Sequence, residues 1–361
     1  MKKFISIVCF LIITTLYQTG FVYAQKGTAV QDTSSAINFI PEEEWDLFGN
    51  VSLLELSLKF DMRKYLKYSE DPEYQDAVLL IHAADTSLEK SIRIKPRGMF
   101  RRGYCAFPPL KLNVKKADFD NEYLEDQKSF KVVTHCKYSS LYETYLLKEY
   151  LIYKLYNQIT DLSFKTRLIK MLYIDVPEKK KPKKTFVKYG FIIEHINSVA
   201  KRNDLIVIKL ENLGQSSMDK DHMALVAMFE FMIGNTDWST AGLHNLKVLK
   251  ALDFNKPYPY PIPYDFDYSG MVDTEYAIPI EDLGIESVTE RLYRGICLPE
   301  EHVLKARDVF IERKDALFKV INDFTYLDKR DKDKMKKYLS SFYEIIEIEK
   351  SFKRSILDSC L

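Results

Sequence analysis

The stretch HMALVAMFEFMIG (His222–Gly234), followed at once by NTDWSTAGLHN (Asn235–Asn245), is the most informative part of the chain. The first segment is almost wholly apolar and predicts a buried helix that ends at Gly234, because glycine is the residue that helices favour just after their last turn. The second segment gathers polar side chains: Asn235, Asp237, Ser239, His244 and Asn245. A helix end so dense in polar groups is either a capped turn or a functional site.

A second acidic segment, PIPYDFDYSG (Pro261–Gly270), places Asp265 and Asp267 two residues apart at the end of a predicted strand, 258–264. Carboxylates at a strand end can hold a hard cation such as Mg²⁺, which takes oxygen ligands. Each segment alone is weak evidence, since Asn and Asp are common in turns. Their order is more informative. A base and a metal ligand after a buried helix, then an acid after the next strand, is the layout of kinase-type phosphoryl transfer.

Cations that could meet phosphate lie earlier in the chain. RGMFRRG (Arg97–Gly103) offers two glycines and three arginines, although the glycines do not fit G-x-G-x-x-G. In the strand pattern that follows, Lys111 alternates with Leu110 and Leu112, which predicts that Lys111 lies on a polar sheet face. A solvated strand is the alternative interpretation.

The order of patterns along the chain predicts an α+β fold. Strand patterns dominate the first half, and one long helix is predicted over 139–158, where neither Gly nor Pro occurs. Long amphipathic helices are predicted near the C-terminus, over 299–324 and 331–357. We therefore expect a sheet-rich lobe over 45–210, an antiparallel sheet plus one long helix, and a helical lobe over 211–361 that carries the catalytic and metal loops. The predicted strands are 54–62, 77–82, 91–95, 110–114, 168–176 and 185–194.

The N-terminus has the pattern of a secretory signal peptide over 1–24, with Lys2 and Lys3 before a short apolar run. A membrane anchor is the alternative, but the run is shorter than the roughly 20 residues that cross a bilayer. Residues 25–44 then predict a flexible leader. We expect an exported, soluble protein, periplasmic or secreted, with no membrane span after cleavage.

Composition excludes several classes of protein. With 46% hydrophobic and 29% charged residues the chain is typical of globular proteins, and a formal net charge of +1 argues against a nucleic-acid partner. The basic run EKKKPKK over 178–184 is better interpreted as a solvated hairpin loop than as a polyanion site. No G-x-S-x-G hydrolase motif or zinc spacing occurs. Four cysteines follow the signal segment, and their pairing is left open: Cys105, Cys136, Cys297 and Cys360.

Several short pieces together resemble the CotH-type spore-coat group of atypical kinases, which includes exported bacterial members. They span about residues 93–270. The pieces are Arg97–Gly98, FPPLKL (Phe107–Leu112), YGFIIEHIN (Tyr189–Asn197), GNTDW (Gly234–Trp238) with the later Asn245, and PYDFD (Pro263–Asp267).

The resemblance implies a two-lobed atypical protein-kinase-like fold that uses ATP and Mg²⁺ and phosphorylates a hydroxyl of a protein substrate. By it, Asp237 is the catalytic base, and Asn245, Asp265 and Asp267 belong to the metal site. Lys111 pairs with the ATP phosphates near Arg97, held by a helix acid, Glu143 or Glu149. The strand that ends near Glu194 and His195 leads into the adenine site.

Two features depart from typical kinases. Asp237 and Asn245 are eight residues apart rather than five, and the acidic segment is DFD rather than DFG. Two alternatives therefore remain beside the kinase. One is an exported pseudokinase, adhesion or binding module without turnover, with which the surplus of Tyr and Phe is compatible. The other is a kinase-fold enzyme that transfers AMP.

Overall fold

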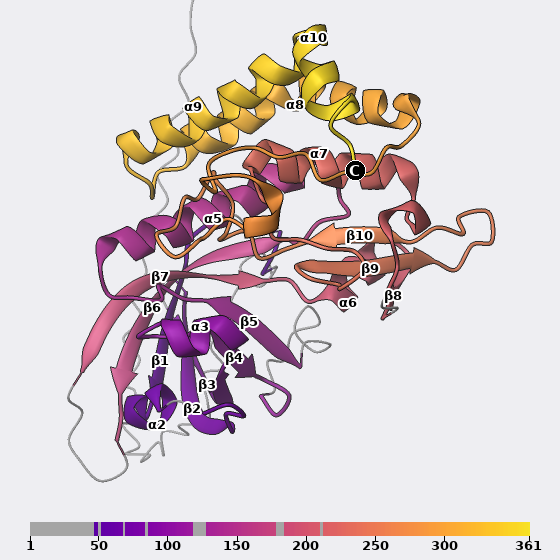
Figure 1. Cartoon of the computed structure of the whole chain (residues 1–361). Helices are drawn as coiled ribbons and strands as arrows, with labels where there is room; N and C mark the ends of the chain where they lie inside the picture. The colour runs from indigo at the N-terminus through magenta and orange to yellow at the C-terminus, as the bar shows by residue number, and fades with distance from the viewer. Residues whose placement is uncertain are drawn as a thin grey trace, which may run out of the picture. The chain divides into compact units, whose positions relative to one another are not determined.

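The computed structural model describes residues 47–49, 52–67, 69–83, 86–117, 128–177, 184–209 and 212–361, which all belong to one compact unit. The predicted signal peptide (1–24) and leader (25–44) lie outside the described residues, as does most of the basic run 178–184. Within the described ranges the fold combines a sheet-rich part and a helical part (Figure 1). This confirms the mixed α and β composition that the sequence predicts, while the division into lobes at 210/211 stays a prediction.

The sheet-rich part is a closed barrel of seven strands in the order β1-β2-β3-β4-β5-β7-β6. Neighbouring strands are antiparallel except β1 and β6, which run parallel with Leu54 opposite Ile169. The antiparallel pairing agrees with the sequence analysis, but the closure was not predicted. The strands are β1 (Leu54–Phe60), β2 (Gln75–Ala83), β3 (Thr86–Pro96), β4 (Leu110–Asn113), β5 (Ser129–Val133), β6 (Thr166–Asp175) and β7 (Thr185–Ile193).

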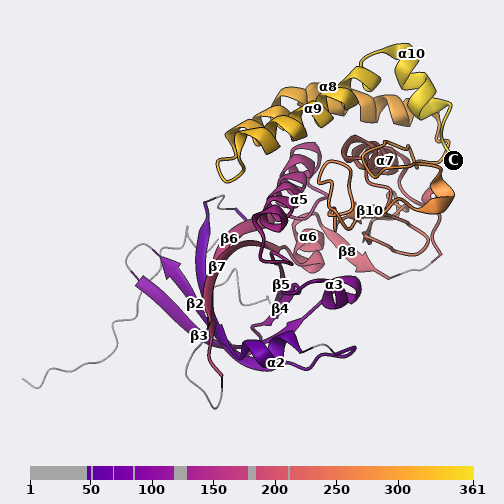
Figure 2. The same cartoon turned by 60° about the vertical axis from the view of Figure 1, so that its left-hand side comes forward.

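Alternation of side chains fills the barrel. Leu110 and Leu112 on β4 are buried in its apolar core, whereas Lys111 between them is half-buried on the opposite face. This agrees with the face that the sequence assigns to Lys111. In the described parts of the chain, short helices that connect these strands or follow them are α2 (Met62–Leu66), α3 (Met99–Tyr104) and α6 (Ile196–Arg202). Of these, α3 lies beside β4 and β5 (Figure 2).

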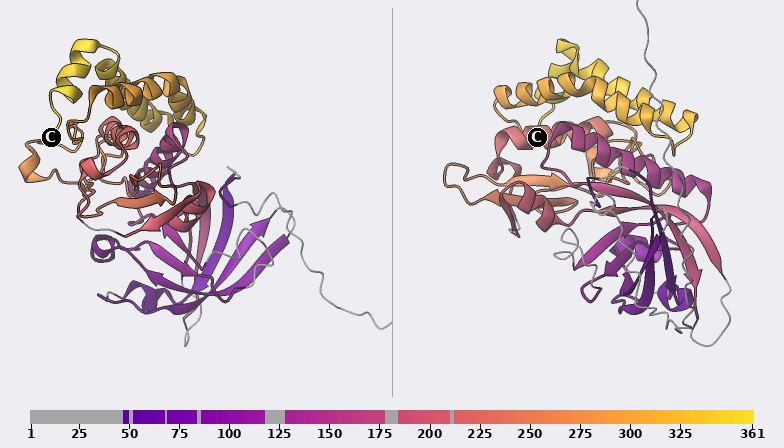
Figure 3. Two further views of the ribbon diagram at one scale, coloured as in Figure 1. Left: turned by 90° about the vertical axis from the view of Figure 1, so that its right-hand side faces the viewer. Right: turned by 180° about the vertical axis from the view of Figure 1, so that it is seen from behind.

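The helical part is layered. The long helix α5 (Ser140–Ile159) packs on β7 and also on α8 (Glu300–Asp323), and α7 (Lys220–Ile233) packs on α8 and on a second sheet. Both views in Figure 3 show α8 and α9 (Lys329–Ile346) on the side of α5 and α7 away from the barrel. The second sheet has the order β10-β9-β8. The remaining elements are β8 (Leu205–Ile208), β9 (Leu246–Ala251), β10 (Tyr260–Pro263), α10 (Glu349–Phe352), two 3₁₀ turns (Gln215–Ser217 and Glu281–Leu283) and a π turn (Lys353–Leu357).

Helix α7 forms where the sequence predicts it. The Asp219 side chain accepts a hydrogen bond from the His222 amide and caps the first turn, and Gly234 ends the helix with φ +65°. Only glycine adopts that left-handed conformation at no steric cost. The residues that follow Gly234 therefore leave the helix at a fixed point.

Two disulfides settle the pairing that the sequence left open: Cys105–Cys136, which follows α3, and Cys297–Cys360 near the C-terminus. Each closes a loop of tens of residues and by loop entropy can stabilise the fold by roughly 4 kcal/mol. Across the described ranges, no helix is both long and apolar enough to cross a membrane.

Candidate functional site

Two loops from different elements meet at one cavity of about 580 Å³. The loop after α7 contributes Asp237 and Asn245, and the segment after β10 contributes Asp265 and Asp267. The structure thus brings together residues that the sequence singled out in two separate stretches. The wall is completed by residues before and within α3, namely Arg97, Gly98, Met99, Phe100 and Arg101, and by Pro109, His244 and Tyr268.

Asp237 is held in place from three sides. Its amide donates to Asn235 Oδ1 over 3.1 Å, its Oδ1 lies 2.8 Å from His244 Nε2, and its Oδ2 accepts from Asn245 Nδ2 over 2.9 Å. The same Asn245 side-chain nitrogen, Nδ2, also donates to the backbone carbonyl of Asp237. An antiparallel bridge between Ser239 and His244 closes the loop and brings His244 back to Asp237. A carboxylate fixed by two donors is oriented for one task.

Side chains of the helical part hydrogen-bond to the loop that carries Asp237. The Glu230 carboxylate accepts from Asn235 Nδ2 over 2.9 Å, and burial raises the pKa of Glu230 to about 8. Arg294 donates to the carbonyls of Thr236 and Trp238, the two neighbours of Asp237 in the chain. These contacts explain why the loop keeps its shape without regular secondary structure.

Two of the seven described non-glycine residues with left-handed backbones line this cavity. Asn245 and Asp265 both have left-handed backbones, with φ +51° and +66°. Asn and Asp tolerate this region better than other non-glycine residues, but it still has a cost, and such strain is often found at functional sites. The Asp265 amide donates to the Tyr153 hydroxyl of α5 over 2.9 Å, which fixes the strained residue against a buried helix.

Three carboxylates form an acidic cluster beside the cavity: Glu149 of α5, Asp265 and Asp267, with one oxygen of each within 4.8 Å of the others. Burial raises the pKa of Glu149 to about 8 and also raises the pKa of Asp267. Asp267 also accepts a hydrogen bond from the Tyr276 hydroxyl over 2.8 Å. Oxygen atoms that converge in this way fit a divalent cation.

A cation of the chain itself contacts all three carboxylates. Arg101 NH2 lies 3.4 Å from Glu149 Oε2, 3.3 Å from Asp265 Oδ1 and 2.6 Å from Asp267 Oδ2. From the sequence, Arg101 is expected only as one of several cations that could meet phosphate. Its position in RGMFRRG marks it as one of three arginines there, but only the structure shows which one points at the acids.

Among the described residues, Lys111 makes no ion pair with either of the two helix acids, Glu143 and Glu149. Lys111 lies opposite Lys95 of β3 and Lys131 of β5 and lines neither cavity described here. Of the two helix acids considered, Glu149 contacts Arg101, as described above. Glu143 instead accepts from Lys188 and from the Tyr189 amide. Lys111 keeps its predicted role as a phosphate-binding residue only as a proposal.

A smaller cavity of about 40 Å³ adjoins Asp265 and carries several cations. Arg97, Lys131 and Lys247 line it together with Phe164 and Tyr264. Burial, reinforced by neighbouring Arg97 and Lys247, lowers the pKa of Lys131 to about 8. Burial also lowers the pKa of Arg97, whose Nε is buried without a hydrogen-bond partner among the described residues. A cavity lined by several cations, with the Arg97 Nε donor unpaired among the described residues, can bind an anion.

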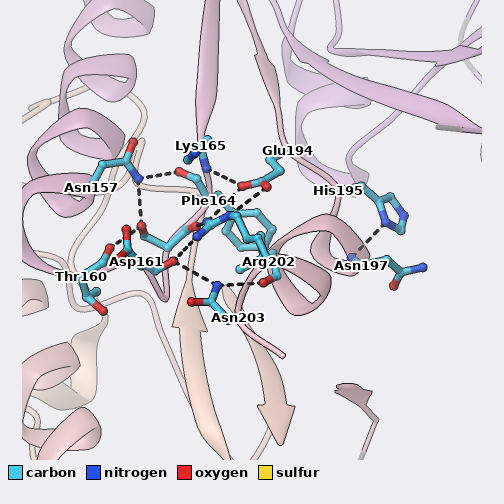
Figure 4. A network of polar contacts seen from close by, with 12 residues as sticks. Asn157, Thr160, Asp161, Phe164, Lys165, Glu194, His195, Asn197, Arg202 and Asn203 are labelled. Carbon is cyan, nitrogen blue, oxygen red and sulfur yellow. Dashed lines mark hydrogen bonds and ion pairs between the residues drawn. The ribbon is translucent and has the colours of Figure 1, made fainter. Parts of the chain in front are cut away.

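Glu194 also lines this small cavity, but its carboxylate is bonded to residues outside the cavity lining. It accepts from Arg202 over 3.1 Å and from the Lys165 amide over 2.9 Å (Figure 4). Arg202 also donates to the carbonyls of Asp161 and Ser163, so the group is a tight structural network. Glu194 thus shapes the wall of the cavity, and its assignment to the nucleotide site stays a prediction.

Comparison with known proteins gives little further guidance. No family model matches the chain, and no curated protein matches it. Among solved structures, it is similar to the crystal structure of a Helicobacter pylori proinflammatory kinase, CtkA, at a TM-score of 0.38 and 10% identity, covering 69% of this chain and 91% of that one. Similarity at this level carries no inference about the fold, the activity or the substrates of this chain.

Proposed function

We propose that this protein is an exported Mg²⁺-ATP-dependent phosphotransferase that acts on a hydroxyl group of a protein, in the cell envelope or outside the cell. One observation carries the proposal. A single cavity gathers an oriented carboxylate, Asp237, with the acids Asp265 and Asp267 and the cations Arg97 and Arg101. Phosphoryl transfer needs these types together, because the protein mainly orients the acceptor and neutralises phosphate charge.

The acidic cluster fits Mg²⁺. Its oxygens come from Glu149, Asp265 and Asp267, and Glu149 Oε1 is buried without a hydrogen-bond partner in the described part of the chain. Asn245 can add its amide oxygen, since its Nδ2 is the atom that donates to Asp237. Bound there, Mg²⁺ would neutralise charge on the phosphate groups of the nucleotide.

Other residues of the chain would accept the proton, compensate the phosphate charge and contact the base. Asp237 is placed to accept the proton of the acceptor hydroxyl, and His244 and Asn245 hold its carboxylate in the orientation that this requires. Arg97 and Lys131, with Lys111 on the neighbouring strand, supply positive charge where a phosphate tail would extend toward the smaller cavity. Phe164, Ile193 and His195 line that cavity and offer apolar and ring surface to a base.

A second candidate function is an exported binding or adhesion module without turnover. The observation that favours it is Arg101, which itself contacts all three carboxylates of the cluster. A protein that has lost its metal would be stable in this state. Both candidates keep the expectation of a protein partner, and neither requires nucleic acid.

The deciding experiment incubates the mature protein with Mg²⁺ and ATP that is labelled on either the γ- or the α-phosphate. Label from the γ position alone identifies a kinase, and label from the α position identifies AMP transfer. We expect γ transfer onto the protein itself, lost in Asp237→Ala. No transfer of either label, with no detectable nucleotide binding, would favour the binding module.

A further inference from the structure

We propose that Arg101 is an internal counter-ion that occupies the cation site, and that a divalent cation binds by displacing it. The inference deepens the proposed function and depends on it only in taking Glu149, Asp265 and Asp267 as the cation site. Arg101 NH2 lies within 3.4 Å of an oxygen of each. One carboxylate oxygen of each acid lies within 4.8 Å of the others, so the guanidinium nitrogen competes with a cation for the same three acids.

Burial explains why some cation must be there. The side chains of Arg101, Glu149 and Asp267 are exposed by only 12%, 3% and 9%. Carboxylates so poorly solvated are strongly destabilising unless a positive charge compensates them. Arg101 supplies a single positive charge to the three acids and contacts each of them directly.

An unused ligand atom points to the second occupant. Glu149 Oε2 contacts Arg101, but Glu149 Oε1 is buried and has no hydrogen-bond partner in the part of the chain that the structure describes. A guanidinium is planar and donates its hydrogen bonds in fixed directions, whereas a metal ion can be coordinated by oxygens from all sides. A divalent cation can therefore use an oxygen that Arg101 leaves unsatisfied.

Displacement would also change the wall of the cavity. Arg101 belongs to α3, which carries Met99 and Phe100 at the cavity wall, and Met99 is 88% exposed there. The Cys105–Cys136 disulfide fixes the residue after α3 covalently, whereas the start of the helix is held by noncovalent contacts such as the bond from Arg102 to the Gly98 carbonyl. Cation binding and access to the cavity are thus coupled through one side chain.

The test is a Mn²⁺ titration of the full mature chain without nucleotide, followed by electron paramagnetic resonance. If Arg101 fills the site in more than nine-tenths of molecules, its removal raises the apparent affinity by about tenfold or more. We expect Arg101→Gln to bind Mn²⁺ at least about tenfold more tightly than the parent. Arg102→Gln is the matched control, since Arg102 is the next residue of α3 and, among the described residues, donates to the carbonyls of Gly98, Ser69 and Glu70 rather than to the acids. It should bind as the parent does.

Equal or weaker binding by Arg101→Gln would overturn the proposal, and so would undetectable Mn²⁺ binding in both proteins. If Arg101→Gln folds only with Mn²⁺ present, the exchange is supported. If it does not fold at all, Arg101→Lys decides: tighter binding than the parent supports the exchange, and equal or weaker binding refutes it.

A second measurement follows the displacement directly. Amide hydrogen exchange over residues 99–104 of the parent should become several-fold faster when Mn²⁺ is added, because the helix loses its anchor. Unchanged exchange with Mn²⁺ bound would refute displacement. The proposed enzyme activity and the displacement of Arg101 can fail separately. If no group is transferred from ATP but Arg101→Gln binds Mn²⁺ more tightly than the parent, the enzyme activity is refuted and the displacement of Arg101 by a cation is still supported.

Discussion

Asn245 Nδ2 donates to Asp237 Oδ2 over 2.9 Å, so the residue proposed to help hold the metal also orients the residue proposed as the base. The spacing of eight residues between them departs from typical kinases. The bridge between Ser239 and His244 accounts for the extra length, because it folds the intervening residues back on themselves. The longer loop thus still delivers both side chains to one cavity.

The two acids of the cavity should differ in their effect on ligand binding. We expect Mg²⁺-ATP to raise the melting temperature of the parent and of Asp237→Asn, because Asp237 is assigned to proton transfer. Asp265→Asn should lose the shift, since Asp265 is assigned to the cation. At 100 times the dissociation constant, binding stabilises by about 2.7 kcal/mol, which thermal denaturation readily detects. Identical shifts in both variants would refute the division of roles.

Arg294 should affect turnover more than binding. It donates to the carbonyls on either side of Asp237, so Arg294→Lys keeps a positive charge but loses the paired contact. We expect kcat for γ-phosphate transfer to fall by about tenfold or more, which corresponds to roughly 1.4 kcal/mol of barrier, with little change in KM.

Arg291→Lys is the matched control for this prediction. Arg291 is a second arginine of the same segment, but it donates to Met232 and Tyr338 carbonyls and to Ser341, away from Asp237. It should lower stability without a specific loss of kcat. Equal loss of kcat in both variants would show that Arg294 acts only through general stability.

The sequence predicted those parts of the site that depend on local pattern. Helix α7 and its end at Gly234 follow from apolar residues and one glycine. The placement of Asp237 and Asp265 after a helix and a strand follows from their order. The meeting of Asp237, Asn245, Asp265 and Asp267 at one cavity agrees with that order, whereas their chemical roles stay predictions.

What the sequence did not predict depends on contacts between distant segments. The barrel closes through the parallel pairing of β1 with β6, and nothing in either strand indicates its partner. Arg101 could not be distinguished from Arg97 and Arg102, because Arg97 precedes the short helix α3 and the helix directs Arg101 and Arg102 differently. Arg102 contacts nearby backbone carbonyls, whereas Arg101 reaches acids that lie far along the chain. Long-range placement of this kind leaves no periodic signal.

Glu230 should make stability fall as the pH rises. Its pKa is about 8 in the fold against an ordinary 4.5, so the folded state holds a proton that the unfolded state has released. The stabilisation from this proton is complete below about pH 4.5 and is lost progressively up to about pH 8.

Replacing Glu230 with Gln should remove this dependence. We expect Glu230→Gln to gain stability over the parent between pH 5 and pH 8, by roughly 3 kcal/mol at the upper end. The measurement is urea denaturation across that range. Glu312→Gln, on an exposed part of α8, is the control and should follow the parent at every pH. A constant difference between parent and Glu230→Gln would contradict the assignment.

The last prediction concerns the contact that joins the two loops of the site. The amides of Gly270 and Met271 donate to the carbonyls of Gly234 and Ile233, each over 3.0 Å. The end of α7 and the segment after Asp267 are therefore held together directly. A methyl group on Gly234 would collide with the Tyr338 hydroxyl and would also require a left-handed alanine at φ +65°.

Gly234→Ala should accordingly destabilise the fold by roughly 2–4 kcal/mol, from backbone strain and overpacking together. Gly103→Ala is the control, since a methyl group there meets nothing within 4 Å. Adding Tyr338→Phe to Gly234→Ala removes the colliding hydroxyl, so the double variant should be more stable than the sum of the single changes predicts. Strict additivity would show that backbone strain alone sets the cost. Because Gly234 precedes Asn235 and Asp237, the single variant should also lose transfer activity at temperatures where it is still folded.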